Sequence, residues 1–276
     1  MSPTDRQFAP AKLTRSLRVV GRRTDGYHLI EAEMVTLDFG DTLELSTDGA
    51  AGAAAGHGSR LEVVDEVRWE PPGEVHVLRV PADGSNLVNR ALQAVGRRAH
   101  VVLRKRIPVG GGLGGGSADA AAVLRWAGCA DVSVAGRLGA DVPFCLIGGR
   151  AMARGIGDEL EPLDPLDGWV VLVTPPVVCE TPAVYRAWDE LGGPKGEWGN
   201  DLEEPAVSYE PRLDWWRTFL EAEAGERPRL AGSGSTWFYE VPSAAGASDL
   251  AAALAAAVAD VGQRAMITSC RMVAAF

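Results

Sequence analysis

The sequence has few of the residues that build disulfide frameworks and zinc sites. Thiols this sparse, with no CxxC pair among 276 residues, are typical of a reduced, cytosolic protein. The four histidines show neither HExxH nor HxxxH spacing, so nothing supports a zinc site. We therefore expect neither a disulfide scaffold nor a zinc enzyme. The four cysteines are Cys129, Cys145, Cys179 and Cys270.

Long apolar runs and an excess of positive charge are also missing. No apolar stretch reaches the roughly 20 residues that a membrane-spanning helix needs, and the first residues carry no signal-peptide core. The formal net charge of -10 disfavours a nucleic-acid partner, although one basic cleft could still hold a small anion. Hydrophobic residues make up 46% of the chain, which is enough for a sizeable core. We expect a soluble, cytoplasmic protein with no membrane or nucleic-acid partner, as a monomer or weak homodimer.

Local patterns predict a mixed α+β fold. Antiparallel strands are expected within residues 8–48, a helix over residues 86–99, and a strand at 101–103 that leads into a glycine loop. Strands and helices do not alternate as regular βαβ units, so a doubly wound sheet is disfavoured. Gly148 and Gly149 suggest a boundary between domains 1–150 and 151–276. Further strands are expected at 61–67, 75–80, 169–173 and 266–273, and further helices at 182–190, 213–223 and 250–261.

The most distinctive segment is a glycine loop, in which six of the seven residues from Gly110 to Gly116 are glycine. Glycine costs conformational entropy on folding, and close approach of the backbone to a bulky anion would explain that cost. The helix that follows, from about Ser117, adds free N–H groups and the positive end of its dipole. Because an apolar strand and a strong helix flank the loop, a phosphate site is favoured over a flexible linker.

Two other nucleotide loops fit this segment less well. A Walker A loop needs a lysine after the glycines, and none follows here. Gly110, Gly112 and Gly115 match GxGxxG, which is a weak pattern by itself. A Rossmann unit also runs a strand straight into its glycines, whereas Pro108 interrupts here. A Rossmann oxidoreductase is therefore disfavoured.

The segment PVGGGLGGGSA resembles the ATP loop of the GHMP kinases. The resemblance implies an ATP site, accompanying Mg²⁺, and a fold with an N-terminal ribosomal-protein-S5-like α/β domain and a C-terminal ferredoxin-like α+β domain. Residues 231–235 (AGSGS) are similar to the family's third motif. Lys105 can also be read as one of a solvated run of charges. The implied ATP-binding residues are Pro108, Val109, Gly110, Gly111, Gly112, Leu113, Gly114, Gly115, Gly116, Ser117, Ala118, Lys105 and Asn86.

Two charged residues stand among apolar or small neighbours: Lys12 follows Ala-Pro-Ala, and Asp141 precedes Val-Pro-Phe. Taken singly, each reads as a solvated surface charge. A charge in such a context tends to have a partner, however, and perturbed pairs favour functional sites. The resemblance to the family's PAK and GADVPF segments implies that Lys12 and Asp141 are the catalytic pair. Asp141 would take or orient the acceptor proton, and Lys12 would stabilise the charge on the transferring phosphoryl group.

A further set of residues points to the acceptor. Asp25-Gly26-Tyr27-His28 reads either as a hairpin turn with an aromatic plug or as a corner that recognises a base. Tyr185 reads either as a core aromatic or as a second stacking face. The resemblance, here to GHMP kinases whose small-molecule substrate carries a cytidine diphosphate, implies that Tyr27 and Tyr185 enclose cytosine and that His28 bonds it. The implied substrate-binding residues are Tyr27, His28, Thr181, Tyr185 and Thr14.

The chain departs from the family pattern in two places. Thr14 stands where the family has Asn, and Arg15 stands where it has an apolar residue, so that Arg15 faces either solvent or a phosphate. The segment before Asp141, residues 123–142, is also shorter than the helix pair that the family usually has there. Two alternatives therefore stay open: a GHMP kinase for another small molecule, and a nucleotide-binding relative with impaired catalysis.

Overall fold

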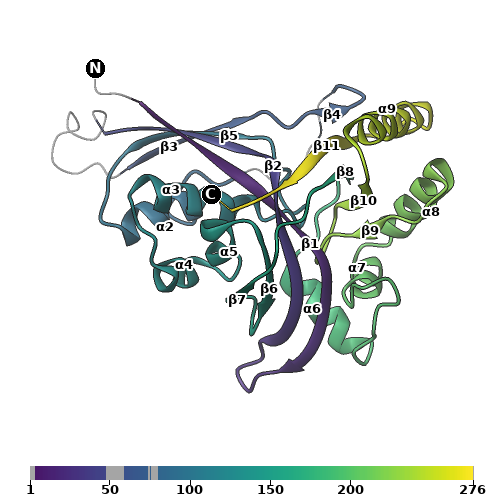
Figure 1. The fold of residues 1–276 in the computed structure, drawn as a ribbon, viewed down its shortest axis with the longest axis horizontal. Helices are drawn as coiled ribbons and strands as arrows, with labels where there is room; N and C mark the ends of the chain where they lie inside the picture. The colour runs from purple at the N-terminus through teal and green to yellow at the C-terminus, as the bar shows by residue number, and fades with distance from the viewer. Residues whose placement is uncertain (1–3, 48–58, 74, 76–79, 276) are drawn as a thin grey trace.

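The computed structural model describes residues 4–47, 59–73, 75 and 80–275. Its strands form one 11-stranded, mainly antiparallel sheet in the order β3-β5-β2-β11-β8-β10-β9 (Figure 1). β1 and β6 also pair with β2, β7 pairs with β6, and β4 pairs with β11. The strands are β1 (Asp5–Arg22), β2 (His28–Ser46), β3 (Arg60–Asp65), β4 (Trp69–Glu70), β5 (His100–Lys105), β6 (Arg150–Arg154), β7 (Glu159–Pro162), β8 (Gly168–Thr174), β9 (Arg229–Leu230), β10 (Trp237–Val241) and β11 (Ala265–Val273).

The long hairpin of β1 and β2 confirms the antiparallel strands expected within residues 8–48. Its turn is closed by Gly26, whose φ of 94° suits a residue without a Cβ. The register of β1 against β2 shifts at Ala11, Arg15 and Val20. Such bulges re-aim the side chains that follow them, and the first two flank the segment that carries Lys12 and Thr14.

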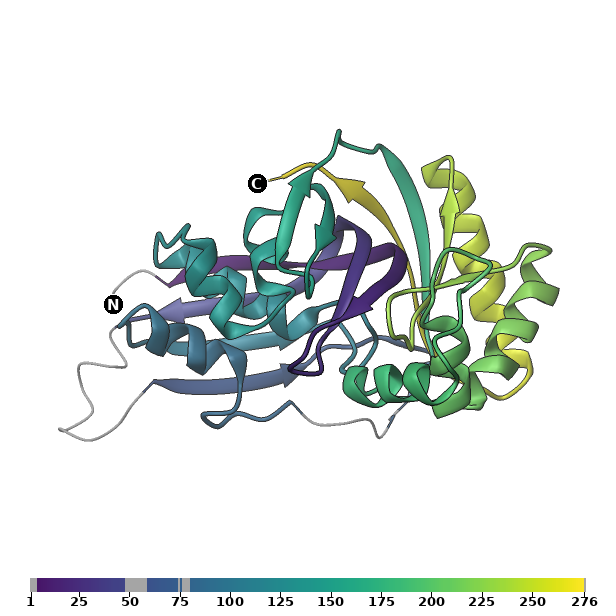
Figure 2. The ribbon, with the colours of Figure 1, turned by 90° about the horizontal axis from the view of Figure 1, so that it is seen from below.

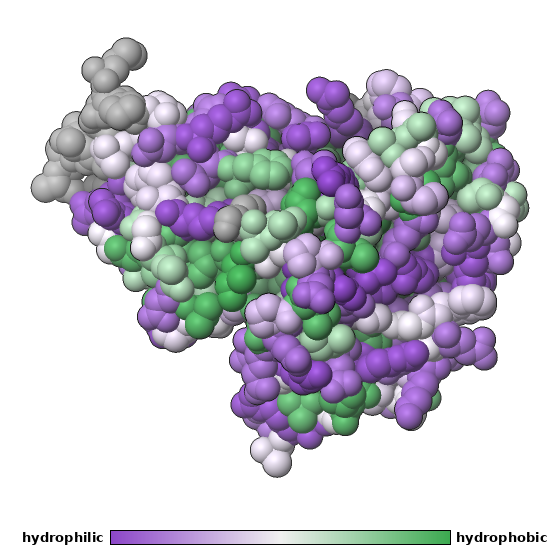
Figure 3. Space-filling view, in the orientation of Figure 1, coloured by the Kyte–Doolittle hydropathy of each residue, from purple (hydrophilic) through white to green (hydrophobic). Residues whose placement is uncertain are grey.

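The helices form two groups at opposite ends of the sheet (Figures 1 and 2). On the space-filling view, apolar side chains gather over α4 and α5, where Val132 and Ile147 are exposed (Figure 3). The helix expected over residues 86–99 ends earlier, at Ala94, because Gly96 takes a positive φ. The first group is α2 (Leu87–Ala94), α3 (Gly115–Trp126), α4 (Val132–Leu138) and α5 (Val142–Ile147); the second is α6 (Thr181–Glu190), α7 (Glu203–Tyr209), α8 (Arg212–Ala224) and α9 (Ala244–Asp260).

The fold class is α+β, as the sequence predicted. β11, the last strand of the chain, lies between β2 and β8, so one sheet runs through both halves, and the division into residues 1–150 and 151–276 stays a prediction. The other expected strands and helices are present, except that the strand expected at 75–80 falls largely outside the described residues. Among the described helices, none is both long and apolar enough to cross a membrane.

Candidate active site

A cavity of about 550 Å³ brings together most of the residues that the sequence singled out. Its wall comes from β1, the glycine loop, the start of α5, the start of α6 and the loop after β9. Three predicted site residues, Tyr27, His28 and Ala118, do not line it. The predicted residues in the wall are Lys12, Thr14, Asn86, Lys105, Pro108, Val109, Gly110, Gly111, Gly112, Leu113, Gly114, Gly115, Gly116, Ser117, Asp141, Thr181 and Tyr185.

The glycine loop packs closely against the loop after β9. A Cβ at Gly112 would lie 2.5 Å from the carbonyl oxygen of Ala231, and Gly112 has a φ of +76°. Glycine is therefore required here both by conformation and by space. Gly114, with a φ of 69°, precedes the first turn of α3, and no side chain caps that helix. The free N–H groups and positive dipole end of α3 thus face the cavity, as an anion site needs.

Lys12 and Asp141 meet inside this cavity. Lys12 Nζ lies 3.3 Å from Asp141 Oδ2, and it also donates a hydrogen bond to Thr14 Oγ1 at 3.0 Å. Asp141 comes directly before α5 and makes no capping hydrogen bond, so its carboxylate is available to the cavity. Lys12 is only 7% exposed, whereas the side chain of Asp141 is 32% exposed. The carboxylate can therefore reach a ligand while the ammonium holds it in place.

Lys105 and Asn86 lie toward the start of α3 and α2. Lys105 is 4% exposed and forms ion pairs with Asp41 and Asp119, so it is no member of a solvated charge run. Asn86 caps α2: its Oδ1 accepts from the N–H of Val88 at 2.8 Å, and its Nδ2 donates to Pro81 O at 2.7 Å. Its amide therefore orders the chain beside the cavity.

An aromatic cluster closes the opposite part of the site. The ring of His28 stacks on Tyr185, with centroids 4.7 Å apart and planes 19° apart. His28 Nε2 lies 2.9 Å from Asp189 Oδ1, and the ring meets the edge of Trp188. Tyr185 lines the cavity, and burial raises the pKa of its phenol above the usual range. His28 thus supports Tyr185 from behind the cavity wall.

Two predicted residues lie away from the cavity for simple geometric reasons. Tyr27 is 59% exposed. It lies at the end of the turn between β1 and β2, just before β2 begins at His28. Ala118 is fully buried in the core, and its N–H donates to Gly114 O at 2.9 Å inside α3. Neither its side chain nor its N–H is therefore presented to the cavity.

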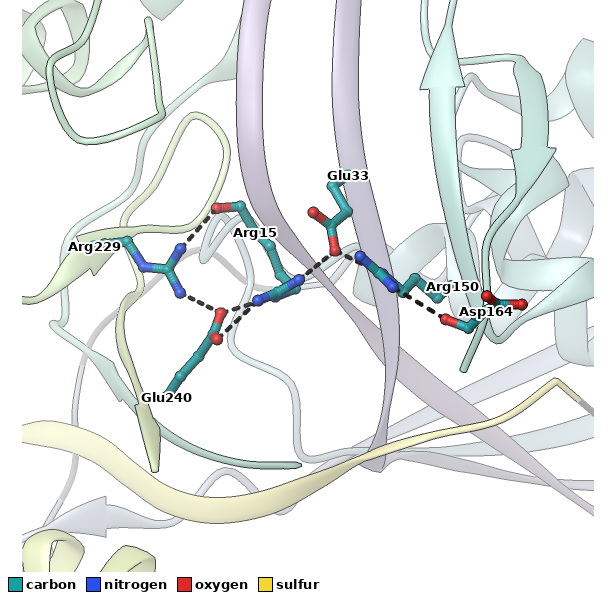
Figure 4. Close-up of polar contacts among 6 residues, drawn as sticks. All are labelled: Arg15, Glu33, Arg150, Asp164, Arg229 and Glu240. Atoms are coloured by element: carbon teal, nitrogen blue, oxygen red, sulfur yellow. Dashed lines mark hydrogen bonds and ion pairs between the residues drawn. The ribbon is translucent and has the colours of Figure 1, made fainter. Parts of the chain in front are cut away.

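Arg15 points neither to solvent nor to a phosphate. It donates two hydrogen bonds of 2.8 Å to Glu240 on β10 and pairs with Glu33 on β2 (Figure 4). Arg229 also pairs with Glu240, and Arg150 donates to Glu33 at 2.7 Å. These five residues, which we call the Arg15 network, join strands from both halves of the sheet at the bulge that follows Thr14.

Sequence reasoning missed several residues of the site. Asp41 and Asp119 are the partners of Lys105. Their pairing could not be predicted from the sequence, because they lie on different elements, β2 and α3. Asp189 follows Tyr185 by one helical turn, so its proximity could have been read from the spacing. The segment 123–142 holds the end of α3 and the whole of α4, which place Asp141 directly at the start of α5.

Comparisons with known proteins cover nearly the whole chain. Residues 86–149 match the family described as GHMP kinases N terminal domain. The 4-diphosphocytidyl-2-C-methyl-D-erythritol kinase of Rhizobium meliloti (strain 1021) is 35% identical over 260 residues, which cover 83% of this chain and 84% of that protein. The enzyme of the same name from Paracoccus denitrificans (strain Pd 1222) is 36% identical over 269 residues, covering 91% and 92%. A crystal structure of 4-(cytidine 5'-diphospho)-2C-methyl-D-erythritol kinase aligns with a TM-score of 0.71 at 30% identity, over 98% of this chain and 100% of that one.

Proposed function

Because this chain belongs to the family of 4-diphosphocytidyl-2-C-methyl-D-erythritol kinases, we propose that it phosphorylates the 2-hydroxyl of that cytidine-bearing alcohol with ATP, a step toward isoprenoid precursors. One observation carries the proposal. The Lys12–Asp141 pair lies in a single cavity with the glycine loop and Tyr185. The cavity thus offers a phosphate site, a carboxylate for the acceptor proton and an aromatic face for a base.

The arrangement supports direct transfer between two bound substrates. Asp141 takes the proton of the acceptor hydroxyl while that oxygen forms a bond to the γ-phosphorus of ATP. The bond from this phosphorus to the β–γ bridging oxygen breaks, and ADP leaves with the electron pair. Lys12, 3.3 Å from Asp141, holds the carboxylate in place and stabilises negative charge on the transferring group. The N-terminus of α3 binds the phosphates.

The site fits a magnesium ion that is held mostly by its substrate. The described residues contain no group of three or more His, Cys, Asp or Glu side chains that could cage a metal. Mg²⁺ commonly binds through phosphates and waters, with only one or two carboxylates from the protein. Ser117 and Asp141, which both line the cavity, are the residues that we propose would hold the ion. The ion, when bound, would neutralise charge on the phosphates of ATP.

The test is release of ADP from purified protein. With ATP and 4-diphosphocytidyl-2-C-methyl-D-erythritol we expect saturable turnover, and with mevalonate or L-homoserine we expect none. Turnover on either of those alcohols alone would instead indicate another GHMP activity. If no acceptor gave ADP above background although ADP itself bound, the chain would be a nucleotide-binding relative without catalysis. The cytoplasmic location and the monomeric or weakly dimeric state are proposed from the sequence alone.

A further inference from the structure

A buried cluster of three charges lies at the end of the cavity where α3 begins. Lys105 Nζ donates to Asp119 Oδ2 at 2.8 Å and to Asp41 Oδ2. The exposed fractions are 4% for Lys105, 2% for Asp119 and 0% for Asp41. The three residues come from β5, α3 and β2, so the cluster depends on the assembled fold. We call these three residues the Lys105 cluster.

The two carboxylates of the Lys105 cluster have different surroundings. Asp41 Oδ1 accepts main-chain N–H groups from Arg106 at 2.5 Å and Ile107 at 2.9 Å, so Asp41 also orders the chain after β5. Among the described residues, Asp119 Oδ1 has no hydrogen-bond partner. The Asp119 side chain accepts its hydrogen bond of 2.8 Å from Lys105, and it lies beside the carboxyl of Asp41. Asp119 is therefore held chiefly by the ammonium group.

A contribution to folding stability does not explain why a second carboxylate, Asp119, is present in the Lys105 cluster. Asp41 by itself already neutralises Lys105, so an ionised Asp119 leaves a net negative charge in a buried place. Burying an extra carboxylate costs more than one hydrogen bond returns. A residue that is unfavourable for folding at a cavity wall is best explained by what it does for a ligand there.

The ammonium of Lys105 is aimed at the phosphate end of the cavity. Lys105 Nζ would lie 3.1 Å from a Cβ built on Gly115, the first residue of α3. Lys105 and Asp119 both belong to the cavity wall. An ammonium has three N–H donors, and the two carboxylates of the described chain engage two of them. The third is left for a ligand beside the free N–H groups of α3.

We propose that Asp119 is a positioning residue for nucleotide binding: with Asp41 it holds the Lys105 ammonium at the N-terminus of α3, directed at the phosphates of ATP. The inference rests on the proposed ATP site. Two anchors on different elements, β2 and α3, hold the ammonium, so that it meets the nucleotide without first losing rotamer freedom. With Asp41 alone, Lys105 would stay paired and buried but would be free to swing away from Gly115.

The experiment measures binding of ADP with Mg²⁺ by titration calorimetry, together with Tm, for wild type and Asp119→Asn. Asp119→Asn is expected to weaken ADP binding about tenfold, as the loss of one charge-assisted contact does, without lowering Tm. In turnover, the KM for ATP should rise by about the same factor while kcat and the KM for the acceptor alcohol stay near wild type. The matched control is Glu203→Gln, because Glu203 is also buried and paired, with Arg227, but does not line the cavity.

Lys105→Met provides the second half of the test. It should weaken ADP binding at least as much as Asp119→Asn, and the double variant should lose no more than Lys105→Met alone. Additive losses would overturn the proposal, because Asp119 would then act apart from Lys105. Unchanged or tighter ADP binding by Asp119→Asn would overturn it as well, as would a loss of Tm with no effect on binding beyond that of Glu203→Gln.

The ADP-binding result can be interpreted even if the proposed function is wrong. ADP binding is measured without any acceptor, so it remains readable even if the acceptor alcohol is a different one. Should Asp119→Asn fail to fold, Asp119→Ala is measured in its place, since it too leaves the Lys105–Asp41 pair neutral. If neither variant folds, the carboxylate is required for the structure, and the proposal is overturned.

Discussion

The ammonium nitrogen of Lys12 lies 3.3 Å from Asp141 Oδ2, while the main-chain N–H of the same lysine donates to Leu113 O at 3.0 Å. One residue of β1 is thus bonded to the carboxylate at the start of α5 and to the glycine loop. A Cβ at Gly114 would lie 2.7 Å from Lys12 Cγ, so the loop also packs on the stem of the side chain. The proposed proton acceptor and the proposed phosphate loop are thereby both held by a single residue, Lys12.

Replacing Asp141 should remove turnover and leave the fold intact. Asp141→Asn keeps the shape of the side chain but cannot take a proton, so kcat should fall by about 10²–10⁴-fold. The Tm should fall, because the buried Lys12 loses its charged partner, but the protein should still fold, because Asp141 caps no helix by its side chain. ADP release and calorimetry measure the two quantities. Asp249→Asn, an exposed change on α9, is the control, and near-full kcat in Asp141→Asn would exclude Asp141 as the base.

The glycine loop should not tolerate a methyl group at Gly112. Gly112→Ala places a Cβ 2.5 Å from Ala231 O, so ADP binding should be lost and Tm lowered. Gly128→Ala is the matched control: Gly128 has a similar φ of +73° but no atom within 4 Å of the added Cβ. The control should show only the cost of a positive φ, about 1 kcal/mol. Equal loss of ADP binding in both variants would contradict the steric explanation.

Tyr185 should matter for the acceptor alcohol and not for ATP. Tyr185→Leu removes the ring that stacks on His28 and lines the cavity, so the KM for the acceptor should rise at least tenfold, consistent with about 1–3 kcal/mol per stacked base. Steady-state kinetics with each substrate varied in turn measures this. Trp215→Leu on α8, where Trp215 is exposed, is the control. If only the KM for ATP rose, Tyr185 would contact ATP and not the acceptor, and the prediction would be wrong.

The Arg15 network should stabilise the junction between the two halves of the sheet. Arg15→Met removes the hydrogen bonds to Glu240 and Glu33, but each glutamate keeps a second arginine, Arg229 or Arg150. The free energy of unfolding should therefore fall by about 1–2 kcal/mol and not by the larger amount that an unpaired buried charge causes. Urea denaturation measures it. Arg23→Met is the control, because Arg23 pairs only locally and is half exposed. If both variants lost the same free energy of unfolding, the Arg15 network would contribute no more than an ordinary surface ion pair.

The stability of the protein should depend on pH through Asp119. Burial raises the pKa of this carboxyl from 3.8 to about 7, against the attraction of Lys105. Because the folded-state pKa is the higher one, the stability that protonation contributes is fully present below about pH 4 and is lost progressively as the pH rises to about 7. Asp119→Asn should therefore gain stability relative to wild type between pH 5 and pH 8, as urea unfolding at both pH values can show. A constant difference would contradict the raised pKa.

The sequence alone determined the features that depend on local chemistry. The run of glycines from Gly110 to Gly116 predicted a tight loop suited to phosphate, because glycine readily adopts the positive φ values and tolerates the close approach seen at Gly112 and Gly114. Turn residues and apolar spacing also located most of the strands and helices. The assignment of Lys12 and Asp141 came from the resemblance to a family, and the structure then brought the two side chains together.

Only the tertiary structure decided which charges meet. From the sequence, Arg15 faced either solvent or a phosphate, and Lys105 lay either near the nucleotide or in a solvated run of charges. The fold brought Glu240 on β10 against Arg15 and enclosed Lys105 with Asp41 and Asp119. The physical reason is that an ion pair depends on distance in space, to which sequence separation is no guide once a sheet has brought remote segments together. The propensity of a segment to form a helix or strand depends on neighbouring residues, whereas the burial and pairing of its charges depend on which remote segments pack against it.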